Sequence, residues 1–213
     1  MKRLNLRRSI FEYVADNRLQ YISVAVAILV GTALGAVSAV SVSGDGYESL
    51  SGYLNNFISA YNLQTVSRAR IFETSMYNNI KLILFLWISG LWVGLIPFTF
   101  LQVGIKGYKV GFSAAFLTMA YKGKGALLAL TALLPQFVIL IPCLTVFAVF
   151  NIKYAMSLRK MRDMRNNSSS VKRDMYLRNF LCMTGITAVL AVCSFMDAYI
   201  VPTVLRPICA LMF

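Results

Sequence analysis

The sequence predicts an all-α membrane protein in which about five transmembrane helices form a single domain, residues 1–213. The first supporting observation is composition, because 58% of the 213 residues are hydrophobic and only 14% are charged. Soluble globular domains carry about 45–50% apolar and about 25% charged residues. The second is the presence of long segments without charge, and the third is the distribution of Lys and Arg between them. A lipid bilayer is the solvent that fits this composition.

Four long segments without a charged residue predict four crossings of the membrane. A helix of about 20 apolar residues spans the hydrocarbon core, where only helices and closed barrels satisfy the backbone hydrogen bonds. A fifth segment, residues 110–121, is uncharged but short, so its length fits either a full crossing or a re-entrant helix. The predicted spans are residues 19–42, 82–104, 107–121, 126–152 and 179–201.

The distribution of basic residues favours five crossings, with a cytoplasmic N-terminus and an external C-terminus. Cytoplasmic segments of membrane proteins are enriched in Lys and Arg. With five crossings, 15 of the 21 basic residues lie inside and 6 lie outside. With four crossings, the strongly basic segment 153–178 would fall outside, against this rule. The largest external segment is then the loop 43–81, and the largest cytoplasmic loop is 153–178.

The net charge of +13 does not predict nucleic-acid binding. Most of the basic residues flank the predicted spans on the cytoplasmic side, where each gains about 1 kcal/mol from anionic lipids. Ser9 and Glu12 form a capping-box pattern, which predicts a short N-terminal helix on the inner membrane surface. The expected partners of this charge are therefore anionic membrane lipids. The first span is too long for the core of a cleaved signal peptide and is expected to remain in place.

The external loop 43–81 predicts a hairpin of two amphipathic helices. Apolar side chains recur there at spacings of three and four, which is typical of one helix face. The first stripe contains Tyr47, Leu50, Leu54, Phe57, Ile58 and Tyr61, and the second contains Val66, Ala69, Phe72, Met76 and Ile80. A segment of fewer than about 40 residues cannot bury a core of its own. The hairpin is therefore expected on the outer leaflet, on the bundle or on a partner protein.

Three pairs of glycines spaced by four residues predict close packing of helices. They are Gly31 and Gly35, Gly90 and Gly94, and Gly107 and Gly111. In lipid, small residues let two helix backbones approach and gain van der Waals contact. Packing within one chain is the first expectation, and the same pattern leaves a homo-oligomer open.

The sequence lacks the residues that most membrane enzymes need. It contains no His, which removes Ser-His and Cys-His nucleophiles, His-ligated zinc and haem with a proximal His. Asp197 is the only carboxylate beside a predicted span, so the aspartate pair of an intramembrane protease is missing. The four cysteines have no metal-binding spacing and are expected to be structural. No enzymatic activity, cofactor or metal site is expected.

A channel or transporter component is the alternative function. Pro97, Pro135 and Pro142 favour kinked helices, and the polar residues Gln102, Gln136 and Asn151 lie within or at the end of predicted spans. A continuous polar path through these residues would favour transport. Five spans, however, do not divide into the two equal repeats of many transporters.

Several short motifs, in order along the chain, resemble the stage II sporulation protein M family. One motif contains Lys106, Gly107, Gly111 and Phe112, and another contains Pro135, Gln136 and Pro142. Further matching positions are Gly31, Gly35 and Ala36, residues 94–97 and residues 197–202. The resemblance covers nearly the whole chain.

The resemblance implies a membrane protein of the engulfment step of endospore formation. Members of the family are expected to bind stage II sporulation proteins D and P, which cut peptidoglycan, and to hold them at the mother-cell membrane around the septum. A non-enzymatic scaffold is therefore the expected function. The candidate docking surface combines the outer hairpin with the end of the last span, and its residues are Tyr47, Leu54, Phe57, Tyr61, Asp197 and Tyr199. An ion pair of Asp197 with Lys81, Lys122 or Lys124 is the alternative role for this carboxylate.

Overall fold

The structure, a computed structural model, describes residues 15, 17–62, 67–163 and 169–210, and every regular element in these ranges is helical. The predicted all-α fold class is therefore confirmed. In chain order the elements are α2 (Arg18–Val40), α3 (Asp45–Asn62), α4 (Arg68–Gly90), the short 3-10 helix η1 (Val93–Leu95), α5 (Ile96–Asp163) and α6 (Ser169–Ala210).

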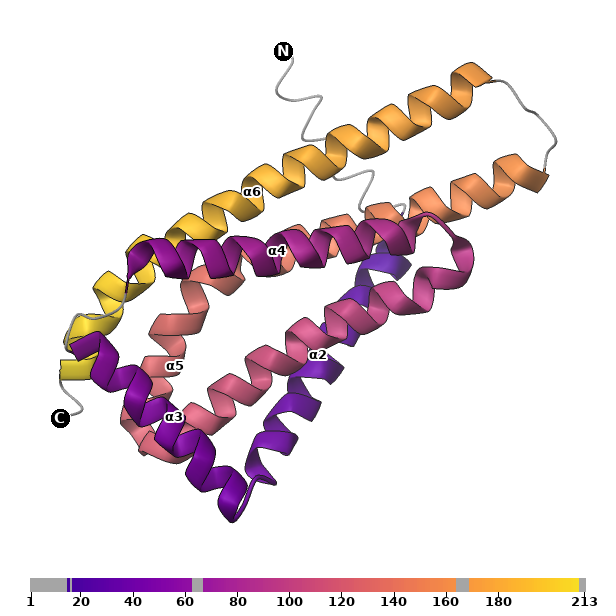
Figure 1. Cartoon of the computed structure of the whole chain (residues 1–213). Helices are drawn as coiled ribbons and strands as arrows, with labels where there is room; N and C mark the ends of the chain where they lie inside the picture. The colour runs from indigo at the N-terminus through magenta and orange to yellow at the C-terminus, as the bar shows by residue number, and fades with distance from the viewer. Residues whose placement is uncertain (1–14, 16, 63–66, 164–168, 211–213) are drawn as a thin grey trace.

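Helix α5 is folded back on itself at Lys122. The backbone angles of this residue, φ 53° and ψ −131°, lie outside the helical region, and the chain reverses direction there (Figure 1). Gly125 follows so closely on the preceding turn that a Cβ atom would overlap the Leu117 carbonyl oxygen. Only glycine tolerates such an approach. Residues 96–121 are called the first half of α5 below, and residues 123–163 the second half.

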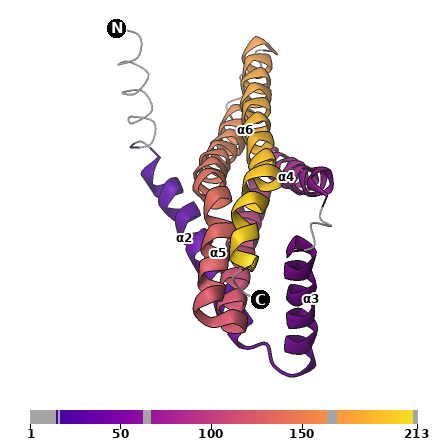
Figure 2. The same ribbon diagram turned by 90° about the vertical axis from the view of Figure 1, so that its left-hand side faces the viewer.

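Helix α5 also lies at the centre of the bundle. α2 packs along its first half, and α4 and α6 contact it as well. Figure 2 shows α2 on one side of α5 and α6, with α3 and α4 on the other side. Buried side chains from α2, α4, α5 and α6 meet in one core, which includes Val24, Leu86, Phe147 and Leu190.

Helix α3 packs its apolar face against the rest of the chain. Ile58 is fully buried and belongs to a second cluster with Leu117 and Leu128 of α5. The Tyr121 hydroxyl, just before the reversal of α5, donates a hydrogen bond to Asn55 Oδ1. The amphipathic stripe of the outer loop is thus used, at least in part, for packing within the chain.

The structure corrects the position of one predicted turn. The charge pattern predicts a helix over 82–104 followed by a turn at 105–109, whereas α4 ends at Gly90 and the turn occupies residues 91–95. α5 begins at Ile96 with Pro97 in its first turn, where the missing N–H has no intrahelical partner to lose. Lys106 and Lys109 therefore lie inside a helix and not in the predicted turn, so they no longer count among the 15 basic residues that the prediction assigns to the cytoplasmic side.

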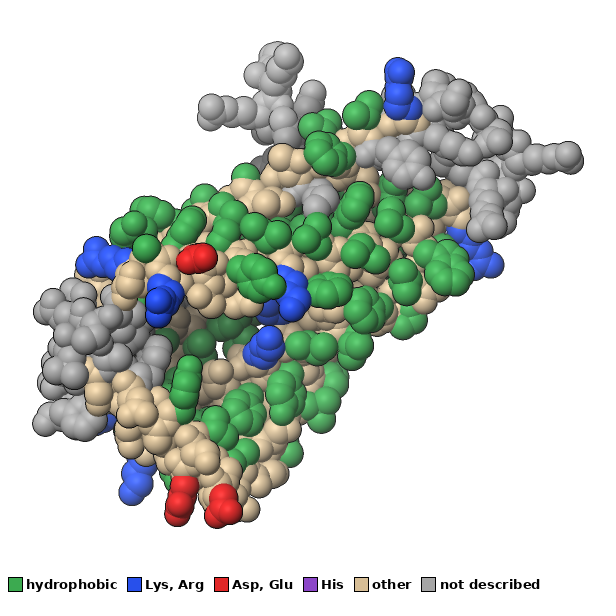
Figure 3. Space-filling model, viewed as in Figure 1, with side chains coloured by type: hydrophobic (Ala, Val, Ile, Leu, Met, Phe, Trp, Pro, Cys, Tyr) green, Lys and Arg blue, Asp and Glu red, His purple; other side chains and the backbone are tan. Residues whose placement is uncertain are grey.

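In the part of the chain that the structure describes, three helical segments are long and apolar enough to cross a membrane. They are Arg18–Val40, Phe137–Lys160 and Asn179–Thr203. α4 and the first half of α5 have the length of a span, but they carry Lys81, Lys106 and Lys109 within them. Figure 3 shows hydrophobic side chains over most of the visible face of the helices, with a few basic groups among them.

The predicted orientation can be tested by labelling single cysteines in a variant that lacks the four native ones. Five crossings place Ser51 of α3 and Thr203 of α6 outside, and Ser169 inside. A cysteine at position 51 or 203 is therefore expected to react with a membrane-impermeant maleimide in intact cells, whereas one at position 169 reacts only after lysis. Labelling at position 169 from the outside would invert the topology.

Candidate functional site

Helix α2 and the first half of α5 run in parallel and pack through glycines. A Cβ atom placed on any of four glycines would overlap a backbone carbonyl oxygen of the other helix: Gly31 on Gly104, Gly35 on Tyr108, Gly107 on Ile28 and Gly111 on Thr32. The two backbones are therefore in direct contact, as small residues permit in lipid. The first and third glycine pairs identified in the sequence lie at this one interface, within a single chain.

Of the remaining pair, Gly90 and Gly94, only Gly90 lies at a contact between two helices. α4 ends at Gly90, and Gly94 lies in the turn, where a Cβ would make only an ordinary contact with Trp92 at 3.7 Å. Gly90 is nevertheless needed for close approach, since a Cβ there would come within 2.8 Å of Asn151 Oδ1 on the second half of α5.

The turn 91–95 lies at one end of the apolar parts of the helices, and this end is called the edge below. Gly90 lies against Asn151, and two residues later Lys153 is the first charged residue after 28 uncharged ones. At the same edge, the side-chain amide of Gln20 in α2 lies 3.9 Å from the Met156 sulfur. The start of α2, the turn and the end of the apolar part of α5 thus lie at one level.

Three lysines lie on α4 and the first half of α5, at a distance from this edge. Since an α-helix rises 1.5 Å per residue, Lys81 is about 13 Å from the edge along α4, and Lys106 and Lys109 are about 15 Å and 20 Å from it along α5. The hydrocarbon core of a bilayer is about 30 Å thick. Lys106 also neighbours Gly107, which packs on Ile28 near the middle of α2. Ionisable residues within membrane-spanning helices are costly and mark functional sites by default.

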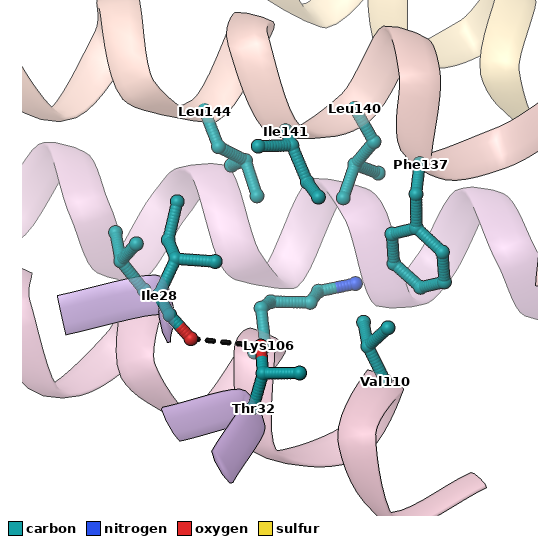
Figure 4. A pocket seen from close by; sticks show the side chains of 10 residues that line it. Ile28, Thr32, Lys106, Val110, Phe137, Leu140, Ile141 and Leu144 are labelled. Atoms are coloured by element: carbon teal, nitrogen blue, oxygen red, sulfur yellow. Dashed lines mark hydrogen bonds between the residues drawn. The ribbon is translucent and has the colours of Figure 1, made fainter. Parts of the chain in front are cut away.

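Lys106 points into a pocket between α2 and the two halves of α5. Figure 4 shows its ammonium directed towards Phe137, among side chains that are almost all apolar. Thr32 also lines the pocket, but its hydroxyl donates a hydrogen bond to the Ile28 carbonyl at 2.8 Å. The pocket offers about 20 Å³ to water, which is room for a single molecule. Lys109 on the same helix and Asp197 on α6 are charged groups near enough to act electrostatically on Lys106.

Polar side chains also join α4 to α6. The Ser75 hydroxyl donates to Asp197 Oδ2 at 2.6 Å, and Asn79 Nδ2 donates to Ser194 Oγ at 3.0 Å. Asn79 and Ser194 are buried, so this bond is shielded from solvent. Hydrogen bonds between membrane helices contribute roughly 0.6–2 kcal/mol each. Asp197 is therefore held by α4 while its charge acts on Lys106 of α5.

A second set of polar contacts fixes α4 to α5 near the turn. Asn151 Nδ2 donates to the Leu86 carbonyl at 3.0 Å, and the hydroxyls of Ser89 and Thr99 are 2.7 Å apart. All three polar side chains are buried. Asn151, one of the residues considered above for a polar path, thus serves to hold two helices together.

The chain can now be compared with known protein families and structures. A family model described as SpoIIM, stage II sporulation protein M, matches residues 24–202. The chain belongs to this family. The match includes the glycine interface, the three lysines and Asp197, and it makes this SpoIIM chain a sporulation-related membrane protein. SpoIIM is not known as a family of enzymes. The comparisons with curated proteins and with solved structures found no match.

Three of the family-motif residues of this SpoIIM chain, Gly107, Gly111 and Phe112, contribute to packing around the first half of α5. Besides Gly107 and Gly111, the ring of Phe112 stacks between those of Tyr108 and Phe116, at centroid distances of 6.1 Å and 6.0 Å. Pro142 is exposed within the second half of α5. The side chains of Pro135 and Gln136 lie outside the described part of the structure.

Two of the candidate docking residues are engaged within the SpoIIM chain. Tyr47 packs on Phe116 with ring centroids 5.7 Å apart, and Leu54 packs against the cluster around Ile58. The side chains of Phe57 and Tyr61 lie outside the described residues. These two contacts favour the bundle as the surface on which the apolar face of α3 rests.

Among the candidate docking residues whose side chains the structure describes, Tyr199 faces outward. It is 42% exposed, stacks on Phe195 with centroids 4.4 Å apart, and lies 5.9 Å from the Arg68 guanidinium. Asp197, two residues earlier, is half-buried and bonded to Ser75. The end of α6 therefore presents an aromatic group beside a basic one, next to α4.

Lys81, Ser75 and Asn79 are site residues that the charge pattern of the sequence does not identify. The pattern ends the predicted loop 43–81 where the uncharged segment begins, which places all three outside the membrane. The signal that points to them is Pro97, which follows the apolar turn and marks a helix start. With a turn at 91–95, a helix long enough to span extends back to Arg68 and includes these residues.

Proposed function

We propose that this chain is a non-enzymatic scaffold of the engulfment machinery, which binds the peptidoglycan-degrading stage II sporulation proteins D and P at the mother-cell membrane. The match to the SpoIIM family over residues 24–202 is the observation that carries the proposal. The engulfing septum is the membrane at which the family is expected to act.

The chemistry of the bundle supports a structural role. The sequence contains no His, and the half-buried carboxylate of Asp197 is bonded to Ser75. The buried polar groups Asn79, Ser89 and Asn151 bond to neighbouring helices. Such bonds fix the relative positions of helices, which is what a scaffold needs. The exposed end of α6 around Tyr199 is the surface we propose for docking outside the membrane.

The proposal is tested by recovering the tagged chain from membranes of sporulating cells and identifying what co-purifies. Proteins D and P are expected to be recovered with the unaltered chain. Tyr199→Ala, at equal expression, is expected to lower their recovery several-fold because it removes an exposed aromatic contact.

Val189→Ala provides a matched control for this experiment. Val189 is 40% exposed on the same helix, ten residues nearer the cytoplasmic end, so its truncation is expected to leave recovery unchanged. If proteins D and P do not co-purify with the unaltered chain, the scaffold proposal is refuted. Equal recovery with Tyr199→Ala would remove only this docking surface.

A channel or transporter component is the second candidate, and the three lysines of α4 and the first half of α5 favour it. Lys81, Lys106 and Lys109 would favour anions over cations in any path through the bundle. Chloride flux through liposomes that contain the purified chain, above the flux of empty liposomes, would support this candidate. Asn151 argues against such a path, because it is fully buried and bonded to the Leu86 carbonyl.

A further inference from the structure

Two of the three lysines of α4 and the first half of α5 face outward from the bundle. Lys81 of α4 and Lys109 of α5 are both exposed, whereas Lys106 is half-buried in the pocket described above. The Lys81 ammonium lies 6.0 Å from the centre of the Tyr77 ring, and Tyr77 is itself 65% exposed. Figure 3 shows basic side chains over the middle of α4 and over the first half of α5, around a hollow bordered by α3, α4 and α5.

We propose that Lys81 and Lys109 bind a membrane-spanning helix of another protein, one that carries an Asp or Glu near its midpoint. This inference rests on the proposed scaffold function for the biological identity of the partner. For the partner's chemistry it rests on the exposed charges, and it takes α4 and the first half of α5 to cross the membrane. It adds a docking surface within the membrane to the external one proposed above.

A position of the two lysines within the membrane favours a counter-charge beside them. An ammonium that faces hydrocarbon is costly, and such residues in membrane helices generally face protein, water or an opposite charge. This chain supplies Asp197 for the inner lysine, Lys106, and Ser75 holds that carboxylate at the α4–α6 contact. The two exposed lysines need a charge from elsewhere.

Lipid phosphate does not reach this site. Lys81 is about 13 Å and Lys109 about 20 Å from the inner edge of a core about 30 Å thick. Lysines snorkel to the headgroups when they lie near the end of a helix, not near its middle. The headgroups of either leaflet are therefore too distant to neutralise both residues.

A second copy of this chain also lacks the necessary carboxylate. Of its eight acidic residues, seven belong to the predicted loops and the N-terminal segment, and the eighth is Asp197. Glu73, which the structure moves into α4, is about 25 Å from the inner edge and so lies near the outer one. A helix of a different protein with a central carboxylate is thus the occupant that complements this face.

The test uses the purified full-length chain in phosphatidylcholine vesicles at pH 8, with synthetic transmembrane peptides as probes. One oligo-leucine peptide carries a single central Glu, and its control carries Gln at the same position. Association is measured by energy transfer between labels on the chain and on the peptide. The Glu peptide is expected to bind roughly tenfold more tightly than the Gln peptide, as polar contacts between membrane helices permit.

Variants assign the effect to the two lysines. The two peptides are expected to bind equally to the double variant Lys81→Gln with Lys109→Gln. The double variant Lys81→Arg with Lys109→Arg is expected to keep the preference for the Glu peptide. Lys160→Gln with Arg173→Gln, which removes two exposed charges near the cytoplasmic side, is the matched control and also keeps it. Helical content measured by circular dichroism verifies that each variant is folded.

Two results would overturn the proposal. One is equal binding of the Glu and Gln peptides to the unaltered chain, and the other is an undiminished preference in the double Gln variant. Lysine-dependent transfer between two labelled copies of the chain would instead identify a second copy as the occupant, and loss of the Glu preference on adding phosphatidylglycerol would identify lipid. No sporulation protein is present in this assay, so its failure is separate from failure of the scaffold function.

Discussion

Gly111→Ala is expected to destabilise the folded chain severely, whereas Gly185→Ala is tolerated. A Cβ at position 111 would overlap the Thr32 carbonyl oxygen, so α2 and α5 would have to move apart along their shared interface. Overpacking of this kind costs typically 1–3 kcal/mol, and lipid supplies no hydrophobic compensation for the lost contact. The measurements are the amount of protein in the membrane and its thermal unfolding in detergent.

Gly185 provides a matched control because it lies in α6, where a Cβ would meet no atom of the described residues within 4 Å. Alanine there is expected to be neutral or slightly stabilising, since glycine is a poor helix former. The stronger pair Gly31→Leu with Gly35→Leu is expected to prevent accumulation of the folded chain. If Gly111→Ala unfolds at the same temperature as the unaltered chain, the two backbones are not in contact.

Lys106→Leu is expected to raise thermal stability while lowering sporulation. The ammonium occupies a pocket whose other side chains are mostly apolar, among them Phe137, Leu140 and Leu144. Leucine fits this lining and removes the cost of a buried charge. For a charged residue at the centre of a membrane-spanning helix this cost is roughly 2.5–3.5 kcal/mol on insertion scales. A residue retained at such a cost is expected to serve function, so fewer heat-resistant spores should form. Unfolding in detergent and spore counts are the two measurements.

The double variant Lys106→Leu with Asp197→Asn separates a role in stability from a role in function. Removing both charges is expected to stabilise the chain at least as much as the single change, because neither charge is then left unpaired. A lower unfolding temperature for Lys106→Leu would show that its electrostatic interaction with Asp197 holds α5 and α6 together. Normal spore counts at equal expression would remove Lys106 from the functional site.

The sequence alone determined the fold class and the faces through which two helices meet. Composition excludes a soluble domain, and segments without charge predict apolar helices, because backbone groups in lipid must bond within the chain. Gly31, Gly35, Gly107 and Gly111 mark surfaces where only a backbone can approach. Both inferences depend on local properties of the chain, which a sequence carries directly.

Only the tertiary structure decided where α4 ends and what surrounds the lysines. Lys106 and Lys109 resemble a cytoplasmic turn in the sequence, but packing of Gly107 and Gly111 against α2 keeps that segment helical. The pairing of Asn79 with Ser194 likewise joins residues that are 115 positions apart. A charged residue marks the end of a membrane-spanning helix only when its charged group lies in water. Whether it does depends on contacts between distant segments of the chain.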